Sequence, residues 1–291
     1  MHKLSTKRNL FLFIFPSFVM YTVYIITPVF ITIYYSFTKY SGIGKPKFIG
    51  LKNYVRLLND EVFFRSLKNS MIIFVLGTLL IVSTAFLLAN LLRSKLKITN
   101  ACRAMIYSPA VIAPIVAGII WVFILDPEIG FINNLLTQMG LENWRQAWIG
   151  GDKLSPYSFT VVFFWRQTGF IATIFIAGLN MIPMDIYESS QIDGANGWQT
   201  MRHITIPMLR QTFVIAIILV ITASFKVFEV VLQLTNGGPN HLSEVLITYT
   251  YNTTFIGGEY GYGMALATAA FLVTMVFSVI NLYVNYRKDE E

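Results

Sequence analysis

The sequence predicts an all-α membrane protein with six transmembrane helices, and its composition, hydropathy and apolar run lengths support this fold class. Of the 291 residues, 55% are hydrophobic and 13% are charged, and the mean hydropathy is +0.60. A water-soluble domain of this length would need a more charged surface. In lipid every backbone polar group must be bonded internally, which leaves helices or a closed barrel. The apolar runs are about twice the length of a barrel strand, and they therefore favour helices.

Six apolar stretches of span length follow one another along the chain. They cover residues 10–37, 69–92, 104–125, 157–182, 211–234 and 263–286. The first stretch follows basic residues, as a signal peptide does, but it is too long for the apolar region of one and lacks a small-residue cleavage site. We therefore expect it to remain as a span, within a single transmembrane domain over residues 1–291.

The distribution of basic residues predicts that both termini are cytoplasmic, because cytoplasmic loops carry an excess of Lys and Arg. With the N-terminus inside, the cytoplasmic segments hold Lys3, Lys7, Arg8, Arg93, Lys95, Lys97, Arg103, Arg202, Arg210, Arg287 and Lys288. Between the third and fourth spans, the outer segment holds only Arg145 and Lys153. The outer segment of residues 235–262 contains neither Lys nor Arg, and it includes Glu244 and Glu259.

The loop after the first expected span dissents from this pattern. It carries the basic residues Lys39, Lys45, Lys47, Lys52, Arg56, Arg65 and Lys68. Apolar residues alternate with them, namely Leu51, Tyr54, Val55, Leu57, Leu58, Val62, Phe63 and Phe64. This mixture predicts an amphipathic helix in the membrane interface, with basic side chains that reach the headgroups. A similar helix is expected over residues 131–139, and a plain extracellular loop is the alternative in both places.

The sequence argues against a catalytic or nucleic-acid-binding role. The net charge of +7 comes mostly from short segments between apolar runs, which fits membrane topology better than nucleic-acid binding. The single Cys102 excludes an internal disulfide and a cysteine metal cluster, and His2, His203 and His241 lie in separate segments. The chain has no Gly-x-x-x-x-Gly-Lys-Ser/Thr run, so we expect it to carry no cofactor of its own and its energy to come from another polypeptide.

The loop of residues 183–210, between the fourth and fifth expected spans, predicts two short helices. It contains a proline suited to start the first helix, an Asp-Gly turn to end it, a cap for the second helix, and an Ile-Pro pair that leads into the next span. In chain order these signals are Pro183, Asp193-Gly194, Asn196 or Gly197, and Ile206-Pro207.

Helices of about two turns are not stable alone in water, so these two need a partner surface. The apolar side chains Ile186, Tyr187, Trp198 and Met201 can pack back on the protein itself. They can equally form a docking surface for another protein. The residues alone leave both alternatives open.

The motif Glu188-Ser189-Ser190-x-x-Asp193-Gly194-Ala195, with Ile204 and Pro207 downstream, resembles the E-A-A/D-G-A loop of ABC importer membrane subunits. It departs from the family where alanines are usual, at Ser189 and Ser190, and where Phe is common, at Met201. The resemblance implies coupling helices that sit in a groove of the ATPase subunits. The residues implied are Tyr187, Glu188, Ser189, Ser190, Asp193, Gly194, Ala195, Trp198, Met201, Ile204 and Pro207. The departures leave open which ATPase is accepted.

Three further segments resemble the subfamily of carbohydrate and glycerol-phosphate permeases. They are residues 48–54, Asp126-Pro127 with Gly130 and Asn133, and the Leu-Thr-Asn-Gly-Gly-Pro run of residues 234–239. The resemblance covers nearly the whole chain and implies a type I importer permease in the bacterial inner membrane. It further implies a second permease subunit of different sequence, a dimer of ATP-binding subunits that holds ATP and Mg²⁺, and an extracytoplasmic solute-binding protein.

Two basic residues fall inside expected spans, Arg166 and Lys226. A charge at mid-bilayer costs about 2.5–3.5 kcal/mol on insertion scales, so each needs compensation. Lys226 and Glu229 are three residues apart and are expected to pair on one helical face while lining a polar cavity. The substrate-pathway candidates are Trp165, Arg166, Asn180, Phe225, Lys226, Phe228 and Glu229. The alternative is structural: Arg166 reaches the interface from near a helix end, and Lys226 and Glu229 hold two helices together.

The mechanism that we infer from the sequence is alternating access, in which ATP-driven closure of the paired ATPases moves the loop from Glu188 to Pro207 as a rigid lever that reorients the spans around a central cavity. An ion-gradient-driven secondary transporter or channel without ATPase partners is the alternative function. Inverted repeats and broken helices would favour that alternative, and the sequence shows neither clearly. A membrane scaffold or receptor would need no charges at depth.

Overall fold

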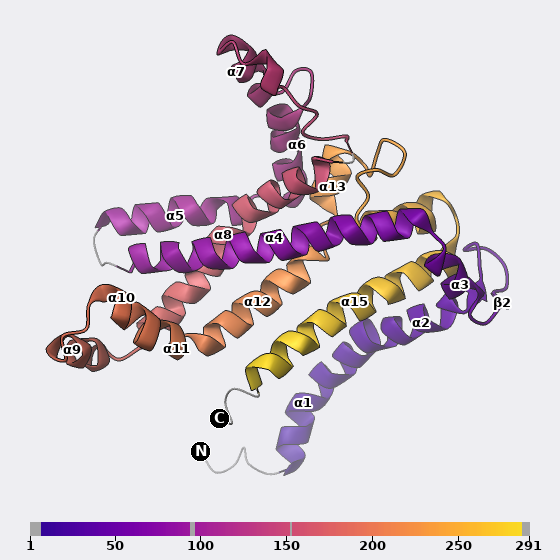
Figure 1. Ribbon diagram of the computed structural model, residues 1–291. Helices are drawn as coiled ribbons and strands as arrows, with labels where there is room; N and C mark the ends of the chain where they lie inside the picture. Colours follow the sequence, from indigo (N-terminus) through magenta and orange to yellow (C-terminus); the bar gives the residue numbers. More distant parts are fainter. Residues whose placement is uncertain (1–6, 94–96, 152, 287–291) are drawn as a thin grey trace. The chain divides into compact units, whose positions relative to one another are not determined.

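The computed structural model describes residues 7–93, 97–151 and 153–286 of the chain (Figure 1). Lys3, Lys95, Arg287 and Lys288, used above to orient the chain, lie outside the described residues. Among these described residues the regular structure is helical apart from one two-stranded hairpin, and the chain divides into two compact units. Residues 1–60 and 250–271 form unit 1, and residues 61–249 and 272–291 form unit 2. The long helix α15, Tyr260–Tyr286, contributes to both.

Unit 1 begins with a nearly continuous apolar helix. Its elements are α1 (Lys7–Tyr21), the π-helical turn η1 (Thr22–Ile26), α2 (Thr27–Ser36), the antiparallel strands β1 (Thr38–Lys39) and β2 (Lys47–Phe48), α3 (Lys52–Leu58) and the π-helical turn η4 (Asn252–Ile256). The helix predicted for this loop is present as α3, but it ends before residues 62–64. Those residues belong to the next long helix, because the chain breaks at Asn59 and Asp60.

Unit 2 holds most of the core. Its elements are α4 (Glu61–Leu91), α5 (Lys97–Val111), α6 (Pro114–Leu125), α7 (Phe131–Gln138), η2 (Glu142–Trp144), α8 (Ser155–Asn180), α9 (Met184–Ile192), α10 (Gly197–Thr200), the π-helical turn η3 (Met201–Thr205), α11 (Ile206–Met208), α12 (Arg210–Ser224) and α13 (Glu229–Leu234). Helix α14 (Leu246–Tyr251) follows and runs into unit 1. Helix α8 is central and packs against α4, α5 and α12.

Four described helices are long and apolar enough to cross a membrane, and two bent pairs raise the number to six. The four are Phe13–Ser36, Glu61–Leu91, Ser155–Asn180 and Tyr260–Val284. The bent pairs are Asn100–Val111 with Pro114–Leu125, at 97°, and Gly197–Met208 with Arg210–Ser224, at 67°. The all-α fold class predicted from the apolar runs is therefore confirmed.

Residues 104–125, expected to form one span, instead belong to two helices, α5 and α6, that meet at a sharp bend. Ala113 is extended, with φ −55° and ψ 135°, and Pro114 starts α6. A residue before proline is driven out of the helical region, and a proline at the first helical position has no N–H to lose. The proline therefore ends one helix and begins another.

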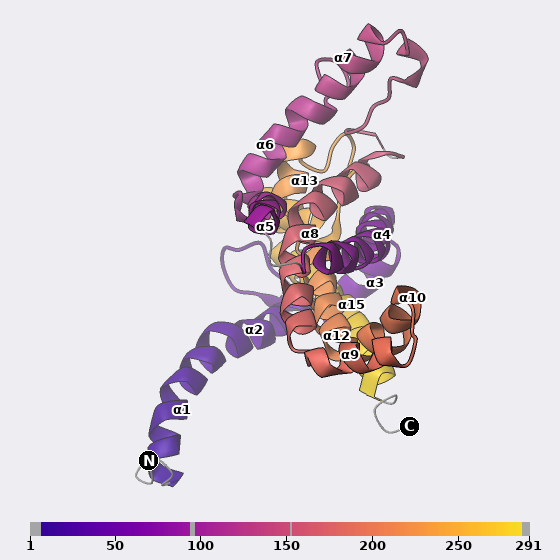
Figure 2. The ribbon, with the colours of Figure 1, turned by 90° about the vertical axis from the view of Figure 1, so that its left-hand side faces the viewer.

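The expected helix over residues 211–234 is also interrupted. Helix α12 ends at Ser224, four residues without helical structure follow, and α13 begins at Glu229. Neither glycine nor proline lies at this break, so the sequence carries no local signal for it. The short helix α13 lies beside α6, as both ribbon views show (Figures 1 and 2).

Close approach of the helices in unit 2 depends on small residues. A Cβ atom at Gly169 of α8 would overlap the carbonyl oxygen of Ile106 in α5, and one at Gly178 would overlap the side chain of Thr212 in α12. Helix packing in lipid depends on such contacts, because no hydrophobic driving force acts between helices there. The aromatic rings of Phe86, Phe175 and Phe213 fill the neighbouring core, with centroids 4.7–5.7 Å apart.

Replacement of Gly169 by alanine is expected to lower the melting temperature of the purified protein in detergent. The new methyl group must displace the α5 backbone, and overpacking of this kind costs about 1–3 kcal/mol. Ala177→Val, at an exposed position of the same helix, is the matched control and should leave the melting temperature nearly unchanged. Equal melting of the two variants would contradict the close contact between α5 and α8.

Candidate functional site

The segment from Pro183 to Met208, here called the α9–α11 segment, joins the end of α8 to the start of α12 (Figure 1). The structure has the two short helices that the sequence predicted. Pro183 precedes the first turn of α9, and α9 ends at Ile192, with Asp193 at its C-cap. Gly194 follows with φ +76°, a conformation that other residues adopt at a cost in strain.

Asn196 closes the start of α10 with a capping box. Its Oδ1 atom accepts a hydrogen bond from the backbone N–H of Gln199 at 2.9 Å. The side-chain Oε1 of Gln199 accepts in return from the backbone N–H of Asn196 at 2.8 Å. Two N–H groups that a helix leaves without partners are thereby satisfied. The predicted cap is therefore present.

The inner face of the α9–α11 segment is fixed to the rest of unit 2 through Tyr187. This side chain is buried, and its hydroxyl lies 3.3 Å from Oγ1 of Thr205 in the returning turn. The guanidinium of Arg93, beyond the end of α4, lies 4.3 Å from the centre of the Tyr187 ring. Ser190 is also buried and donates to the Tyr187 carbonyl at 2.8 Å. Met201 packs against the hydrophobic core, so part of the segment packs back on the protein.

The outer face carries apolar side chains in water-accessible positions. Ile192 is 86% exposed and Trp198 is 63% exposed. A groove of 410 Å³ runs between the helices and is lined by Asp185, Ile186, Ser189, Ser190, Asp193, Ala195 and Ile204. Exposed apolar groups beside a groove mark a surface that contacts another molecule. The side chains that pack on the protein and the exposed apolar side chains therefore lie on different faces of the same segment.

The candidate coupling residues divide between these two faces. Tyr187 and Ser190 are buried and position the helices, and Ala195, Met201 and Ile204 are half-buried. The exposed members of the set are Glu188, Ser189, Asp193, Gly194, Trp198 and Pro207.

A second site lies where the two broken helices meet α8. A cavity of 290 Å³ is lined by Pro114, Phe163, Arg166, Gln167, Ala223, Lys226, Val227, Phe228, Glu229 and Val230. It thus lies at the α5–α6 bend, at the break after α12 and at the middle of α8. Pro114, Phe163 and Gln167 were not among the residues predicted from the sequence. Pro114 is the one with a signal, because a proline in an apolar stretch marks a break.

Arg166 is the main charged group of this cavity. Its Nη2 atom donates to the carbonyl oxygen of Ile112 at 3.4 Å, at the α5–α6 bend. It also interacts electrostatically with Glu229, the first residue of α13. Its Nε atom is buried and makes no hydrogen bond within the described part of the chain. An arginine in this setting can offer a donor to a polar solute.

The predicted pair of Lys226 and Glu229 on one helical face is wrong. Lys226 lies in the break before α13 and is exposed, whereas Glu229 starts α13. The i,i+3 geometry needs an uninterrupted helix, and the break removes it. The charge that faces Glu229 comes from Arg166 on α8 instead.

The other pathway candidates are dispersed. Phe228 lines the cavity, while Trp165 packs edge-on against Trp121 at 5.7 Å between ring centroids. Phe225 is buried against Phe74, at 5.6 Å. Asn180 is exposed at the end of α8, roughly 20 Å along that helix from Arg166.

The Leu-Thr-Asn-Gly-Gly-Pro run of residues 234–239 folds around a buried carboxylate that the sequence indicated only as a loop charge. Glu244 is fully buried. Its carboxylate accepts a hydrogen bond from the hydroxyl of Thr248 and lies 3.1 Å from Nδ1 of His241. A Cβ atom at Gly237 would overlap this carboxylate, which explains the glycine at that position. The loop therefore packs around its own buried polar groups.

The charge arrangement in the cavity predicts a thermodynamic coupling between Arg166 and Glu229. Arg166→Gln or Glu229→Gln alone removes one member of this electrostatic interaction, and both should lower the melting temperature. The double variant should lose less than the sum, with a coupling of about 0.5–3 kcal/mol. Arg145→Gln removes an exposed charge and serves as the control. Additive effects in thermal melts would contradict the pairing.

An all-α bundle with broken helices around a charged cavity, and a capped pair of short helices between two spans, defines a membrane transport subunit. The profile described as "Binding-protein-dependent transport system inner membrane component" matches residues 77–289. The chain belongs to this family. Membership confirms the predicted ABC importer permease, its place in the inner membrane and its role as a non-catalytic translocation component. It supports no gradient-driven alternative, although the structure has the broken helices that were expected to favour one.

Relatives match over nearly their whole length. The probable ABC transporter permease protein YurN of Bacillus subtilis is 34% identical, over 94% of each chain. The probable starch degradation products transport system permease protein AmyD of Thermoanaerobacterium thermosulfurigenes is 32% identical, over 96% of this chain and 94% of its own. The arabinooligosaccharides transport system permease protein AraP of Bacillus subtilis is 30% identical, over 96% of this chain and 88% of its own.

A solved structure shares the fold. A chain of a bacterial ABC transporter involved in the import of the acidic polysaccharide alginate superposes with a TM-score of 0.81 at 23% identity, over 98% of this chain and 97% of that chain. The match confirms the fold of a type I ABC importer permease.

Proposed function

We propose that this chain is the membrane-spanning subunit through which an ATP-driven importer passes a sugar, an oligosaccharide or a related polar solute to the cytoplasm. The α9–α11 segment carries this proposal, because it is anchored on one face and presents apolar side chains on the other. On this account a dimer of ATP-binding subunits, which holds ATP and Mg²⁺, grips the exposed face. The N- and C-termini then lie on the same cytoplasmic side.

The mechanism follows from how the segment is joined to the cavity. Helix α8 enters the segment and carries Arg166, and α12 leaves it and leads to Lys226. A displacement of the α9–α11 segment would therefore act on both walls of the charged cavity. In this proposal, closure of the ATPase dimer moves the segment as a rigid lever and opens the cavity to alternate sides of the membrane.

The solute is inferred from chemistry and from the relatives. Arg166 and Gln167 offer hydrogen-bond donors, Glu229 offers acceptors, and the Phe228 ring lines the same cavity. Such a mixture suits hydroxyl-rich molecules. The names of AmyD and AraP refer to starch degradation products and arabinooligosaccharides. A carbohydrate is therefore the proposed cargo, delivered by an extracytoplasmic binding protein.

A second permease subunit of different sequence is expected to complete the pathway. The cavity of 290 Å³ lies at the lower end of the size of ligand sites, which bury most of a ligand's surface. The helix Phe13–Ser36 also has no buried residue in its most apolar window. Lipid and a partner permease together would cover such a face.

Trp198→Ala is expected to weaken association with the ATP-binding subunits. A tryptophan at the centre of an interface commonly contributes about 2 kcal/mol or more, so affinity should fall about thirtyfold. Glu188→Lys, on the exposed face of α9, should act in the same direction by reversing a charge. Copurification of the ATP-binding subunits and ATPase stimulation by the loaded binding protein are the measurements.

Trp144→Ala is the matched control, because Trp144 is equally exposed but lies in η2, outside the α9–α11 segment. It should leave copurification unchanged. Full copurification and full ATPase stimulation in both Trp198→Ala and Glu188→Lys would contradict the docking proposal.

A further inference from the structure

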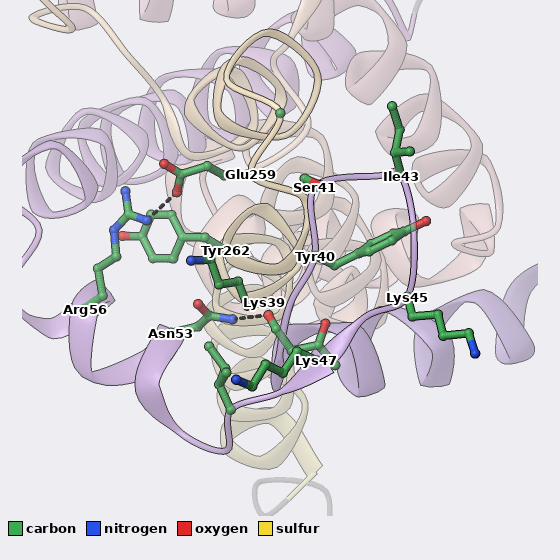
Figure 3. A pocket seen from close by; sticks show the side chains of 13 residues that line it. Lys39, Tyr40, Ser41, Ile43, Lys45, Lys47, Asn53, Arg56, Glu259 and Tyr262 are labelled. Carbon is green, nitrogen blue, oxygen red and sulfur yellow. Dashed lines mark hydrogen bonds and ion pairs between the residues drawn. The ribbon is translucent and has the colours of Figure 1, made fainter.

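A cavity of 550 Å³ lies within unit 1, and it shares no lining residue with the groove of the α9–α11 segment or with the charged cavity (Figure 3). Its walls come from the hairpin between β1 and β2, from α3 and from the first turn of α15. Lys39, Tyr40 and Lys47 line it on the hairpin side. Arg56 and Tyr262 close it on the helical side.

The cavity keeps a positive charge after its acidic groups are paired. Glu259 forms an ion pair with Arg56, whose guanidinium also lies 4.0 Å from the centre of the Tyr262 ring. Within the described residues, neither Lys39 nor Lys47 is paired with a carboxylate, and in Figure 3 both line the same opening. Lys45 also lines the cavity, but in Figure 3 its side chain points away from Lys39 and Lys47, so two of the three ammonium groups share the opening where an anion can bind.

Chain connectivity places the cavity at the membrane boundary. Thr38 lies two residues beyond Ser36, the end of the first candidate span. Tyr262 lies at the start of the last candidate span, Tyr260–Val284. The two span ends are tied together by a hydrogen bond from the N–H of Gly261 to the Tyr40 carbonyl, at 3.0 Å. Tyrosine and basic residues at span ends lie at the level of the lipid headgroups.

The surroundings of the cavity favour lipid over a soluble protein partner. Ile43, on its rim, is 87% exposed, and Phe48, in the same hairpin, is 68% exposed. Leu51 and Val55 continue this exposed apolar surface along α3. Basic groups beside exposed apolar side chains suit a phosphate and the acyl chains attached to it.

We propose that this cavity binds the headgroup of an anionic phospholipid. The phosphate lies between Lys39 and Lys47, and the acyl chains lie against the exposed apolar residues Ile43 and Phe48. The bound lipid thereby holds the hairpin and α3 at the start of α15. This assignment requires only that the chain is embedded in a membrane, and it does not depend on the coupling role of the α9–α11 segment.

The test compares lipid retention by variants of the full-length chain, purified with the subunits that accompany it. The samples are reconstituted in equal amounts of phosphatidylglycerol and phosphatidylcholine, extracted again, and the retained lipid is read by native mass spectrometry. Lys39→Gln with Lys47→Gln should lower the phosphatidylglycerol preference by about fivefold for each lysine removed. Lys39→Arg with Lys47→Arg should preserve it.

Lys52→Gln is the matched control, since Lys52 is an exposed lysine of α3 that does not line the cavity. It should leave the preference unchanged. An unchanged preference in the double glutamine variant would overturn the proposal. Displacement of the lipid by inorganic phosphate would also overturn it, by assigning the site to a soluble anion. A third contradicting result is that the double glutamine variant retains lipid but no longer associates with the binding protein. The two lysines would then bind an acidic protein surface and not a lipid.

Discussion

Lipid offers no hydrogen bonds to a peptide backbone, and the arrangement of unit 2 depends on this constraint. A helix can break at membrane depth only where other groups bond the freed carbonyls and N–H groups. At the α5–α6 bend, Arg166 reaches the carbonyl of Ile112, and the same side chain faces Glu229 at the start of α13. The broken backbone and the charged residues are therefore two parts of one arrangement. The guanidinium bonds a carbonyl oxygen at the bend, and the bend places that polar backbone group beside the charge within an apolar bundle.

The α9–α11 segment has a different constraint. Its helices are too short to be stable alone in water, so they need contacts with other parts of the protein. The buried Tyr187, the guanidinium of Arg93 above its ring and the capping box at Asn196 supply that support from within the chain. The other face is exposed and carries the apolar side chains Ile192 and Trp198 beside polar residues. Because the segment is held by contacts within the chain and is continuous with α8 and α12, a displacement of it would be transmitted to the cavity walls.

The sequence predicts local features well and distant pairings poorly. Pro183, Gly194 and Asn196 each act on their own backbone, so the short helices could be placed from their residue types. The break after Ser224 has neither glycine nor proline, so the residue types there carry no local signal for it. The partnership of Arg166 with Glu229 joins helices far apart in the chain. Helical spacing predicted Lys226 as the partner instead, because it assumed an uninterrupted helix.

The most direct test of the account is to measure from which side of the membrane the exposed face of α9 can be labelled. In a Cys102→Ser background, which removes the one native cysteine, Ser189→Cys places a single thiol on that face. Labelling by a membrane-impermeant maleimide is then compared between right-side-out and inside-out membrane vesicles. Each preparation is labelled with and without bound ATP-binding subunits. The account predicts labelling only in inside-out vesicles, with protection when those subunits are bound. Labelling from the outer side, or equal labelling with and without those subunits, would contradict it.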